Sequence, residues 1–274
     1  MKLDLHTHST LSDGRFTPEE IVDMACAADF RVLAITDHDS ISSFDLGRAS
    51  LRGRDLALIP GVEISASCGE EELHILAYFR FSIPPAIRTF LTAALARREE
   101  RAKEILASLR KRGVPLDLDD IRTVAKGESV SRAHVAEVMV ARGHAASIED
   151  AFDRHLHYRH GIIPLALTPV EEAIRLIGAS DGIAVWAHPP AEDLEGRLGR
   201  FVKAGLRGIE AYRRRTKGVR TARLIELGDT HGLFTTAGSD WHGHGGEPLS
   251  EVLSFPPHRL RPFLGEFGLD HLAA

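Results

Sequence analysis

Nine side chains of types that bind metal ions stand at or just after apolar, strand-like segments spread over most of the 274-residue chain. They are His6, His8, Asp13, His38, Glu63, His74, His188, Asp240 and His242. The densest group is at the start, where side chains alternate along a strand, so that His6 and His8 share one face and can bind one cation together. Asp13 follows on the next loop, and His38 ends the next apolar run. This distribution indicates a metal-dependent hydrolase.

The same residue types can hold two cations that activate a water molecule for hydrolysis. Imidazole suits Zn and Fe, and carboxylates admit Mn or Mg, so the mixed set fits Mn²⁺, Fe²⁺ or Zn²⁺. Two such cations about 3.5–4 Å apart hold a bridging water as hydroxide and stabilise the attacking and leaving oxygens. This chemistry needs no protein nucleophile, and the sequence contains no serine nucleophile elbow, no Walker loop and no redox cysteine pair.

Composition agrees with a soluble enzyme. Hydrophobic residues make up 43% and charged residues 27% of the chain, which is typical of globular proteins. The sequence has no apolar run near the roughly 20 residues of a membrane-spanning helix and no signal-like N-terminus, so we expect a cytoplasmic protein. The net charge of -5 argues against binding of duplex nucleic acid and leaves small phosphorylated substrates. Cys26 and Cys68 give no disulfide framework.

Short apolar segments alternate with helical patterns, which predicts β/α units around a parallel sheet. Seven strands are expected, near residues 2–6, 31–36, 56–64, 73–80, 182–187, 207–212 and 233–238. Every candidate ligand falls at the carboxyl end of a predicted strand or in the loop after it. Thr17, Pro18 and Glu20 form a capping-box signature for the first helix, and the same device recurs from Thr168 to Glu171.

The alternation breaks between about residue 84 and residue 165. Pro84 and Pro85 precede a long segment, residues 86–112, with helical apolar spacing, and Gly113 ends it. Further helical patterns lie near 117–126, 131–142 and 147–157. We therefore expect an all-helical insertion. The charge run at residues 97–101 is interpreted as a solvated helix face.

Six motifs resemble the polymerase-and-histidinol-phosphatase (PHP) family of metal-dependent phosphoesterases. They are DLHTHSTLSDG, AITDHD, GVEIS, HILAYF, AHP and GSDWH, in family order from residue 4 to residue 242. The likeness is nearest to stand-alone bacterial members that act on nucleotides and nucleic-acid ends. It implies an α/β fold, a distorted seven-stranded (β/α)7 TIM-like barrel made of residues 1–83 and 165–274. The insertion, residues 84–164, would be a substrate lid.

The resemblance also implies two to three divalent metal ions, Mn, Fe or Zn. It assigns three metal positions, held by His6, His8, Glu63 and Asp240, by Glu63, His74 and His188, and by Asp13, His38 and His242. Glu63 would bridge the first two ions, because a carboxylate has two oxygens. Glu63, His188 and Asp240 are the catalytic candidates, the last two as proton carriers. Asp37 and Asp39 flank His38 and could be ligands themselves, but we favour a role in orienting imidazoles by accepting their other N–H.

Arg132 and His134 are candidates for binding the substrate phosphate. They follow Ser131 at the predicted start of a helix, where the backbone N–H groups favour an anion. The matching residues of nucleotide-hydrolysing relatives face the phosphate. The alternative is a surface arginine and a capping histidine.

Arg213 and Arg214, with Arg215 and Lys217, depart from the family pattern after the strand near 207–212. They form either a solvated face or a contact for an additional phosphate. The second alternative would favour a bisphosphate or an oligonucleotide end.

We therefore expect hydrolysis of nucleotide phosphates: a 5′-mononucleotide, a 3′,5′-bisphosphate or a short oligonucleotide end. A cyclic sugar-phosphate phosphodiesterase and a histidinol-phosphate phosphatase share the metal motifs, and an amidohydrolase fits less well. A metal-stabilised binding module without turnover is the alternative of another class. The oligomeric state is left open.

Overall fold

Nine strands form two sheets in the part of the chain that the computed structural model describes, namely residues 1–40, 42–157, 160–161, 167–190, 194–214, 218–246, 248–249 and 255–273. The first sheet is parallel with the order β1 (Lys2–Thr7), β2 (Phe30–Ile35) and β3 (Ala57–Leu58). The second has the order β6 (Thr168–Pro169), β4 (Gly61–Cys68), β5 (Glu71–Tyr78), β7 (Ile183–Trp186), β8 (Gly208–Tyr212) and β9 (Phe234–Ala237). The α/β class is confirmed.

The prediction of a purely parallel sheet is wrong at β5. This strand runs antiparallel to β4 and to β7, because the two residues between Cys68 and Glu71 turn the chain straight back. The strand expected over residues 56–64 is also two strands, β3 and β4, which are separated at Pro60 and belong to different sheets. The second sheet is therefore mixed, and β4 and β5 are its longest strands.

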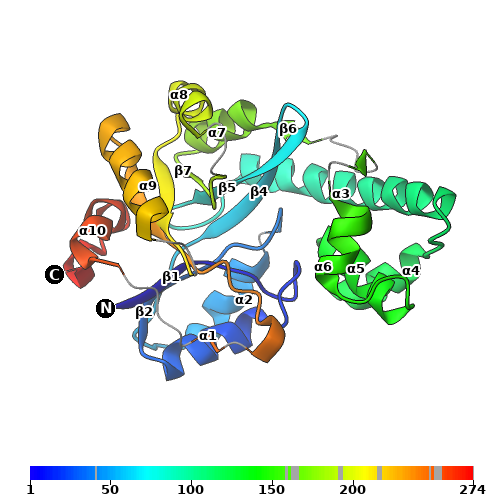
Figure 1. Ribbon diagram of the computed structural model, residues 1–274. Coiled ribbons are helices and arrows are strands. Elements are labelled where there is room, and N and C mark those ends of the chain that lie inside the picture. The colour runs from blue at the N-terminus through cyan, green and yellow to red at the C-terminus, as the bar shows by residue number, and fades with distance from the viewer. Residues whose placement is uncertain are drawn as a thin grey trace.

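Helices cover the outside of both sheets (Figure 1). The helices α1 and α2 accompany the first sheet, and α7, α8, α9 and α10 accompany the second; their bounds are Pro18–Ala27, Ser42–Leu51, Val170–Ala179, Leu194–Ala204, Gly218–His231 and Pro257–Gly265. The capping box of Thr17 and Glu20 is confirmed. The second predicted cap is wrong, because Thr168 lies in β6 opposite Ala66, and α7 begins after Pro169 without a side-chain cap.

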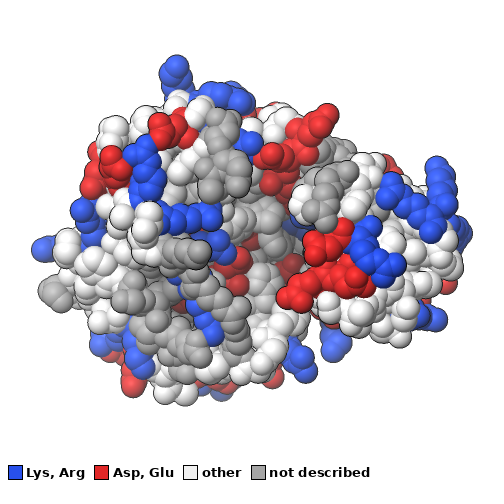
Figure 2. All heavy atoms as spheres, in the orientation of Figure 1, with Lys and Arg blue, Asp and Glu red and all other residues white. Residues whose placement is uncertain are grey.

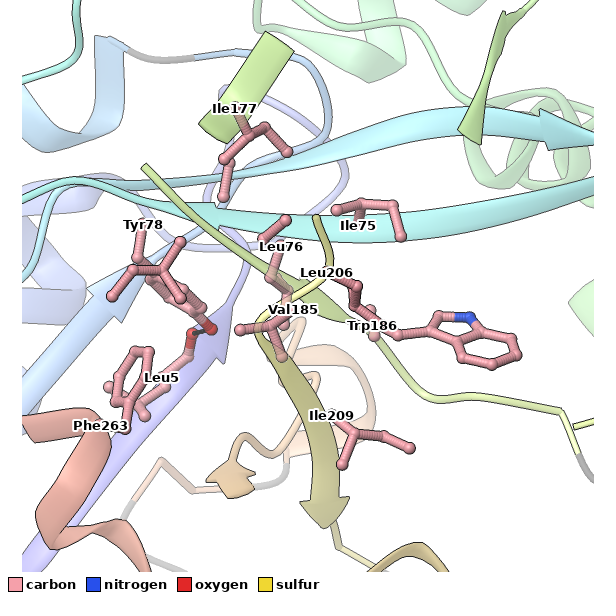
Figure 3. Packing of buried hydrophobic residues seen from close by; sticks show 14 of the residues in the cluster. Leu5, Ile75, Leu76, Tyr78, Ile177, Val185, Trp186, Leu206, Ile209 and Phe263 are labelled. Carbon is pink, nitrogen blue, oxygen red and sulfur yellow. Dashed lines mark hydrogen bonds between the residues drawn. The ribbon is translucent and has the colours of Figure 1, made fainter. Parts of the chain in front are cut away.

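The main hydrophobic core lies between these helices and the strands. Figure 3 shows Leu5, Tyr78 and Phe263 packed together, with Val185 and Ile209 on the neighbouring strands. All five side chains are fully buried, and the Tyr78 hydroxyl donates a hydrogen bond of 2.7 Å to the Leu5 carbonyl. The packing ties β1 to β5 and α10, and so fixes the strands that carry the candidate ligands.

The helices expected after residue 84 are present in the described residues up to Leu156, and they lie to one side of the strands (Figure 1). They are α3, α4, α5, α6 and a short π-helix, over Pro85–Lys111, Leu118–Ala125, Arg132–Ala141, Ile148–Ala151 and Phe152–Leu156. These helices have a hydrophobic cluster of their own, which includes Leu109, Ile121 and Met139. In the described residues, no helix combines the length and the apolar character needed to cross a membrane.

The interpretation of residues 97–101 as a solvated face is wrong for two of its arginines. Arg98 and Arg101 are each only 7% exposed. They lie on the side of α3 that faces the β4–β5 hairpin, where Arg98 pairs with Asp39 and Arg101 with Glu72. Buried cations of this kind persist because each has a carboxylate partner.

Candidate metal centre

The nine candidate ligands lie together, although they come from many strands and loops. Short distances between imidazole nitrogens and carboxylate oxygens connect all nine of them, as described below. The expectation that every one stands at or after a strand's carboxyl end is wrong for Glu63 and His74. Glu63 is the third residue of β4 and His74 the fourth of β5, because this hairpin continues past the cluster toward the insertion.

The first group consists of His6, His8, Glu63 and Asp240. The Nε2 atoms of His6 and His8 both lie 3.3 Å from Glu63 Oε2, and 3.4 and 3.3 Å from Asp240 Oδ1. The two imidazoles and Glu63 are fully buried. Four donor atoms therefore converge on one point, as the alternation of His6 and His8 along β1 predicts.

A second group forms around the other oxygen of Glu63. Its Oε1 lies 3.0 Å from His74 Nδ1 and 3.0 Å from His188 Nε2. His38 Nδ1 lies 3.1 Å from Oε2 of the same carboxylate. Glu63 thus faces both groups, which is the geometry that a bridging carboxylate requires.

A third group surrounds Asp13. Its carboxylate lies 3.4 Å from His242 Nε2, 3.7 Å from His8 Nδ1 and 3.8 Å from His38 Nε2. These four residues could hold one further ion, and His8 and His38 are shared with the neighbouring groups.

Buried atoms without partners show that the residues fit cations. Asp13 Oδ1, His38 Nδ1 and Glu63 Oε2 are buried and make no hydrogen bond in the described part of the chain. Burial disfavours the charge of Glu63, yet His38 and His6 outweigh it and hold the pKa of Glu63 well below its usual range. Burial likewise opposes the charge of His8, but Asp240 and Glu63 raise the pKa of His8 to about 10. The buried carboxylates therefore need compensating positive charge within the cluster, which divalent ions would supply.

Glu210 on β8 orients this cluster and was not singled out from the sequence. The side chain is fully buried; its Oε1 lies 2.9 Å from His6 Nδ1, and its Oε2 accepts the His188 backbone N–H at 2.8 Å. A carboxylate on the second ring nitrogen fixes the orientation of an imidazole ligand. The sequence does contain a sign of this role, because Glu210 is a charged residue within an apolar strand.

The expectation that Asp37 and Asp39 orient imidazoles directly is wrong. Asp37 accepts hydrogen bonds from Ser9 and Ser12, and the Ser12 hydroxyl lies 3.4 Å from His8 Nδ1. Asp39 accepts from the Ser65 N–H and pairs with Arg98 at 2.5 Å. Both carboxylates therefore hold the surrounding loops and helices in place.

Two residues of the cluster have strained backbone conformations. His188 and Asp240 have φ values of 29° and 58°, in the left-handed region that residues other than glycine rarely adopt. At Gly238, a Cβ atom would collide with the His6 side chain and the Glu210 carboxylate. Only glycine allows β9 to approach β1 so closely, and this approach brings Asp240 to His6 and His8.

A cavity of about 190 Å³ opens from the cluster toward the insertion. Asp13, His38 and His74 of the cluster line it, together with three arginines of the insertion, Arg98, Arg101 and Arg132. Arg98 and Arg101 were missed from the sequence, because a run of charged residues gives no sign of which members are buried. The arginines make this cavity suitable for an anion.

Arg132 and His134 stand at the start of α5, as expected. Arg132 Nη2 lies 3.5 Å from a Glu72 oxygen, and its guanidinium lies 5.7 Å from the centre of the Phe152 ring. His134 is buried, and its Nδ1 accepts the Ser131 backbone N–H at 3.1 Å in a capping arrangement.

Arg213 lies beside the first group rather than in solvent. Its Nη2 is 3.0 Å from Asp240 Oδ2 and its Nε is 3.4 Å from Glu210 Oε2. Arg214 is half-buried. Arg215 and Lys217 lie outside the described residues.

Of the other histidines, His244 approaches the site, with Nε2 at 2.9 Å from the Asp13 carbonyl. His160 instead contacts the Asp153 carbonyl in the insertion at 2.7 Å. Cys26 and Cys68 are free cysteines, as expected, and both are half-buried.

The profile of the PHP domain matches residues 4–158. The chain belongs to the PHP family. It is 34% identical to the 5′-3′ exoribonuclease Rnm of Salmonella typhimurium over 87% of this chain and 84% of that one. It is 31% identical to a 3′,5′-nucleoside bisphosphate phosphatase of Chromobacterium violaceum over 93% of both chains. The solved structure of an amidohydrolase from the same organism, with bound sulfate and no metal, matches with a TM-score of 0.88 at 30% identity, over 98% of this chain and 97% of that one.

Family membership confirms the resemblance inferred from the six motifs. The protein is a metal-dependent phosphoesterase, a hydrolase of phosphate esters. His188, Asp240 and His242 lie beyond the matched profile, yet they complete the cluster in space. Figure 2 shows acidic and basic side chains intermingled over the visible, described surface, in line with the small negative net charge.

We predict that Glu63→Gln loosens metal binding in the first two groups together. The substitution keeps the size of the side chain but removes its charge and one strong donor oxygen. Bound Mn²⁺ should fall below the wild-type amount, and turnover of a phosphate ester should fall by roughly a hundredfold or more. Elemental analysis after Mn²⁺ loading measures the first and a phosphate-release assay the second.

The control is Glu100→Gln, an exposed residue of α3, which should change neither quantity. Wild-type metal content and turnover in Glu63→Gln would contradict the role given to this carboxylate.

Proposed function

We propose that this phosphoesterase hydrolyses nucleotide phosphates: a 5′-mononucleotide, a 3′,5′-bisphosphate or the end of a short oligonucleotide. The observation that carries the proposal is the cavity between the carboxylate–histidine cluster and the three arginines of the insertion. A phosphate placed there would meet the cluster on one side and guanidinium groups on the other. The relatives named above as an exoribonuclease and a nucleoside bisphosphate phosphatase support a nucleotide as the rest of the substrate.

In this proposal the nine candidate ligands hold two to three divalent ions, Mn, Fe or Zn, in the three groups described. When bound, such ions would polarise the phosphate ester and lower the pKa of a water molecule that attacks it. Glu63 is shared by the first two groups, and the orphaned oxygens of Glu63 and Asp13 support occupation by cations. His188 and Asp240, at the exposed edge of the cluster, are our candidates for carrying a proton to or from the reacting oxygens.

Arg132 would contact the substrate phosphate, with Arg98 and Arg101 behind it in the same cavity. Its planar fork can donate two parallel hydrogen bonds, and the N-terminus of α5 adds the partial positive charge of its free N–H groups. His134 would act by holding the first turn of α5, since its Nδ1 is engaged there. Arg213 would steady Asp240, and Arg214 is our candidate for contact with a second phosphate.

The strands that carry these residues would form one distorted seven-stranded barrel. Two isolated bridges support this, Thr7 with Trp241 and His38 with Glu63, because they connect the first sheet to the segment after β9 and to β4. The ring would then run through β1, β2, β4, β5, β7, β8 and β9. Residues 1–83 and 165–274 would form this barrel, and residues 84–164 a lid that brings its arginines over the metal ligands.

A substrate panel tests the proposed function. With added Mn²⁺, AMP, adenosine 3′,5′-bisphosphate and a short 5′-phosphorylated RNA should be hydrolysed with kcat/KM roughly tenfold or more above histidinol phosphate and a cyclic ribose phosphate, because specific contacts discriminate by about that factor. Release of phosphate or mononucleotide is the measurement. A preference for the cyclic ester would replace the nucleotide assignment, and Mn²⁺ binding without any turnover would favour a non-catalytic module.

Replacing Arg132 tests the phosphate contact. We expect Arg132→Ala to lose about 1.5–3 kcal/mol of transition-state binding, the range for a hydrogen bond to a charged group, at unchanged metal content. Lys at this position should restore only part of the loss, since it supplies charge without the fork. The measurement is kcat/KM on the best nucleotide of the panel.

Arg122→Ala, on the exposed side of α4, is the matched control. If Arg132→Ala behaves like this control, the cavity does not bind the phosphate through Arg132.

A further inference from the structure

Glu72 is a buried carboxylate at the junction between the metal cluster and the insertion. It stands two residues before His74 on β5, so both side chains point to the same face of the strand. The Glu72 side chain is 5% exposed, whereas the adjacent Glu71 side chain is 55% exposed and pairs with Arg197. An acidic side chain is kept from water in this way only when other groups compensate its charge.

One oxygen of Glu72 serves the metal cluster. Oε1 lies 3.2 Å from His74 Nε2, while His74 Nδ1 faces Glu63 Oε1 at 3.0 Å. The imidazole is therefore held between two carboxylates. With the Nε2 hydrogen donated to Glu72, the Nδ1 lone pair points at the second group of candidate ligands, which is the tautomer that metal binding requires.

The other oxygen of Glu72 serves the insertion. Oε2 lies 2.6 Å from Arg101 Nη2, on α3, and 3.5 Å from Arg132 Nη2, on α5. The first contact is a short charge-assisted hydrogen bond, and the second is longer and weaker. A single carboxylate thus connects a ligand-bearing strand to two helices of the insertion, inside the cavity described above.

These same neighbours compensate the negative charge of Glu72. The guanidinium groups of Arg101 and Arg132 face its Oε2, and the His74 ring nitrogen faces its Oε1. Glu72 is therefore an acceptor on both oxygens.

We propose that Glu72 is a positioning residue that orients His74 for metal binding and fixes Arg101 beside the phosphate cavity, so that the metal centre and the helical insertion are coupled through one carboxylate. The proposal rests on the proposed metal-dependent hydrolysis. In this arrangement Arg101 stays paired with Glu72, and Arg132, whose contact with Glu72 is longer, faces the substrate phosphate. Glu72 itself touches neither the reacting atoms nor the ions.

The test compares Glu72→Gln with the matched control Glu71→Gln on the same strand. Mn²⁺ affinity of the metal-free protein is measured by calorimetry without substrate, and kcat and KM are measured on the best substrate. In Glu72→Gln the affinity for the ion held by Glu63, His74 and His188 should fall roughly 10- to 100-fold, the range for loss of a partner behind a histidine ligand. At saturating Mn²⁺, kcat should stay below wild type while KM does not rise, because loss of a negative charge beside the cavity does not weaken binding of an anion.

Glu72→Asp separates charge from packing. It retains the carboxylate at a shorter reach, so it should keep more of the Mn²⁺ affinity than Glu72→Gln does. Mn²⁺ affinity in Glu72→Gln equal to that in Glu71→Gln would overturn the proposal, as would equal losses in the Asp and Gln variants. Because calorimetry needs no substrate, wild-type protein that binds Mn²⁺ but hydrolyses nothing would refute the proposed function while the role of Glu72 is still decided.

Discussion

The structure depends on the cost of burying the carboxylate of Glu63. The side chain has no exposed surface, and five imidazoles, His6, His8, His38, His74 and His188, lie within 3.0 to 3.3 Å of its two oxygens. A buried charge without such compensation would cost several kcal/mol. The histidines must therefore be held in position, and they come from four segments between residue 6 and residue 188. The fold can be understood as the means by which these segments converge on one carboxylate.

Further carboxylates around the cluster hold these ligand-bearing segments in position. Glu210 holds His6 and the His188 backbone, Asp37 holds the loop after His8 through two serines, and Glu72 holds His74. Asp4 binds the Ser239 backbone and hydroxyl and so fixes the loop that carries Asp240. Positive φ values at His188 and Asp240 show that these contacts are strong enough to impose unfavourable backbone conformations.

Much of this was predictable from the sequence, and the omissions have physical causes. The alternation of His6 and His8, the capping box at Thr17 and the apolar spacing of α3 are local signals, and local signals survive folding. The apolar residues of β5 do not reveal the direction of the strand, because antiparallel pairing depends on the short turn before it. Arg98 and Arg101 were assigned to solvent, since burial of a charge depends on a distant partner, here Asp39 and Glu72. Sequence patterns alone therefore do not show which buried charges pair with partners far away in the chain.

The central claim is that Glu63 joins adjacent cation positions rather than closing a single one. Isothermal titration of the metal-free protein with Mn²⁺, checked by elemental analysis of the loaded protein, measures this most directly. The account predicts more than one ion per chain, approaching three, with the ion at Asp13, His38 and His242 bound less tightly because that group does not include Glu63. A firm plateau at one ion per chain would contradict it, since one cation cannot use both oxygens of Glu63 as a bridge.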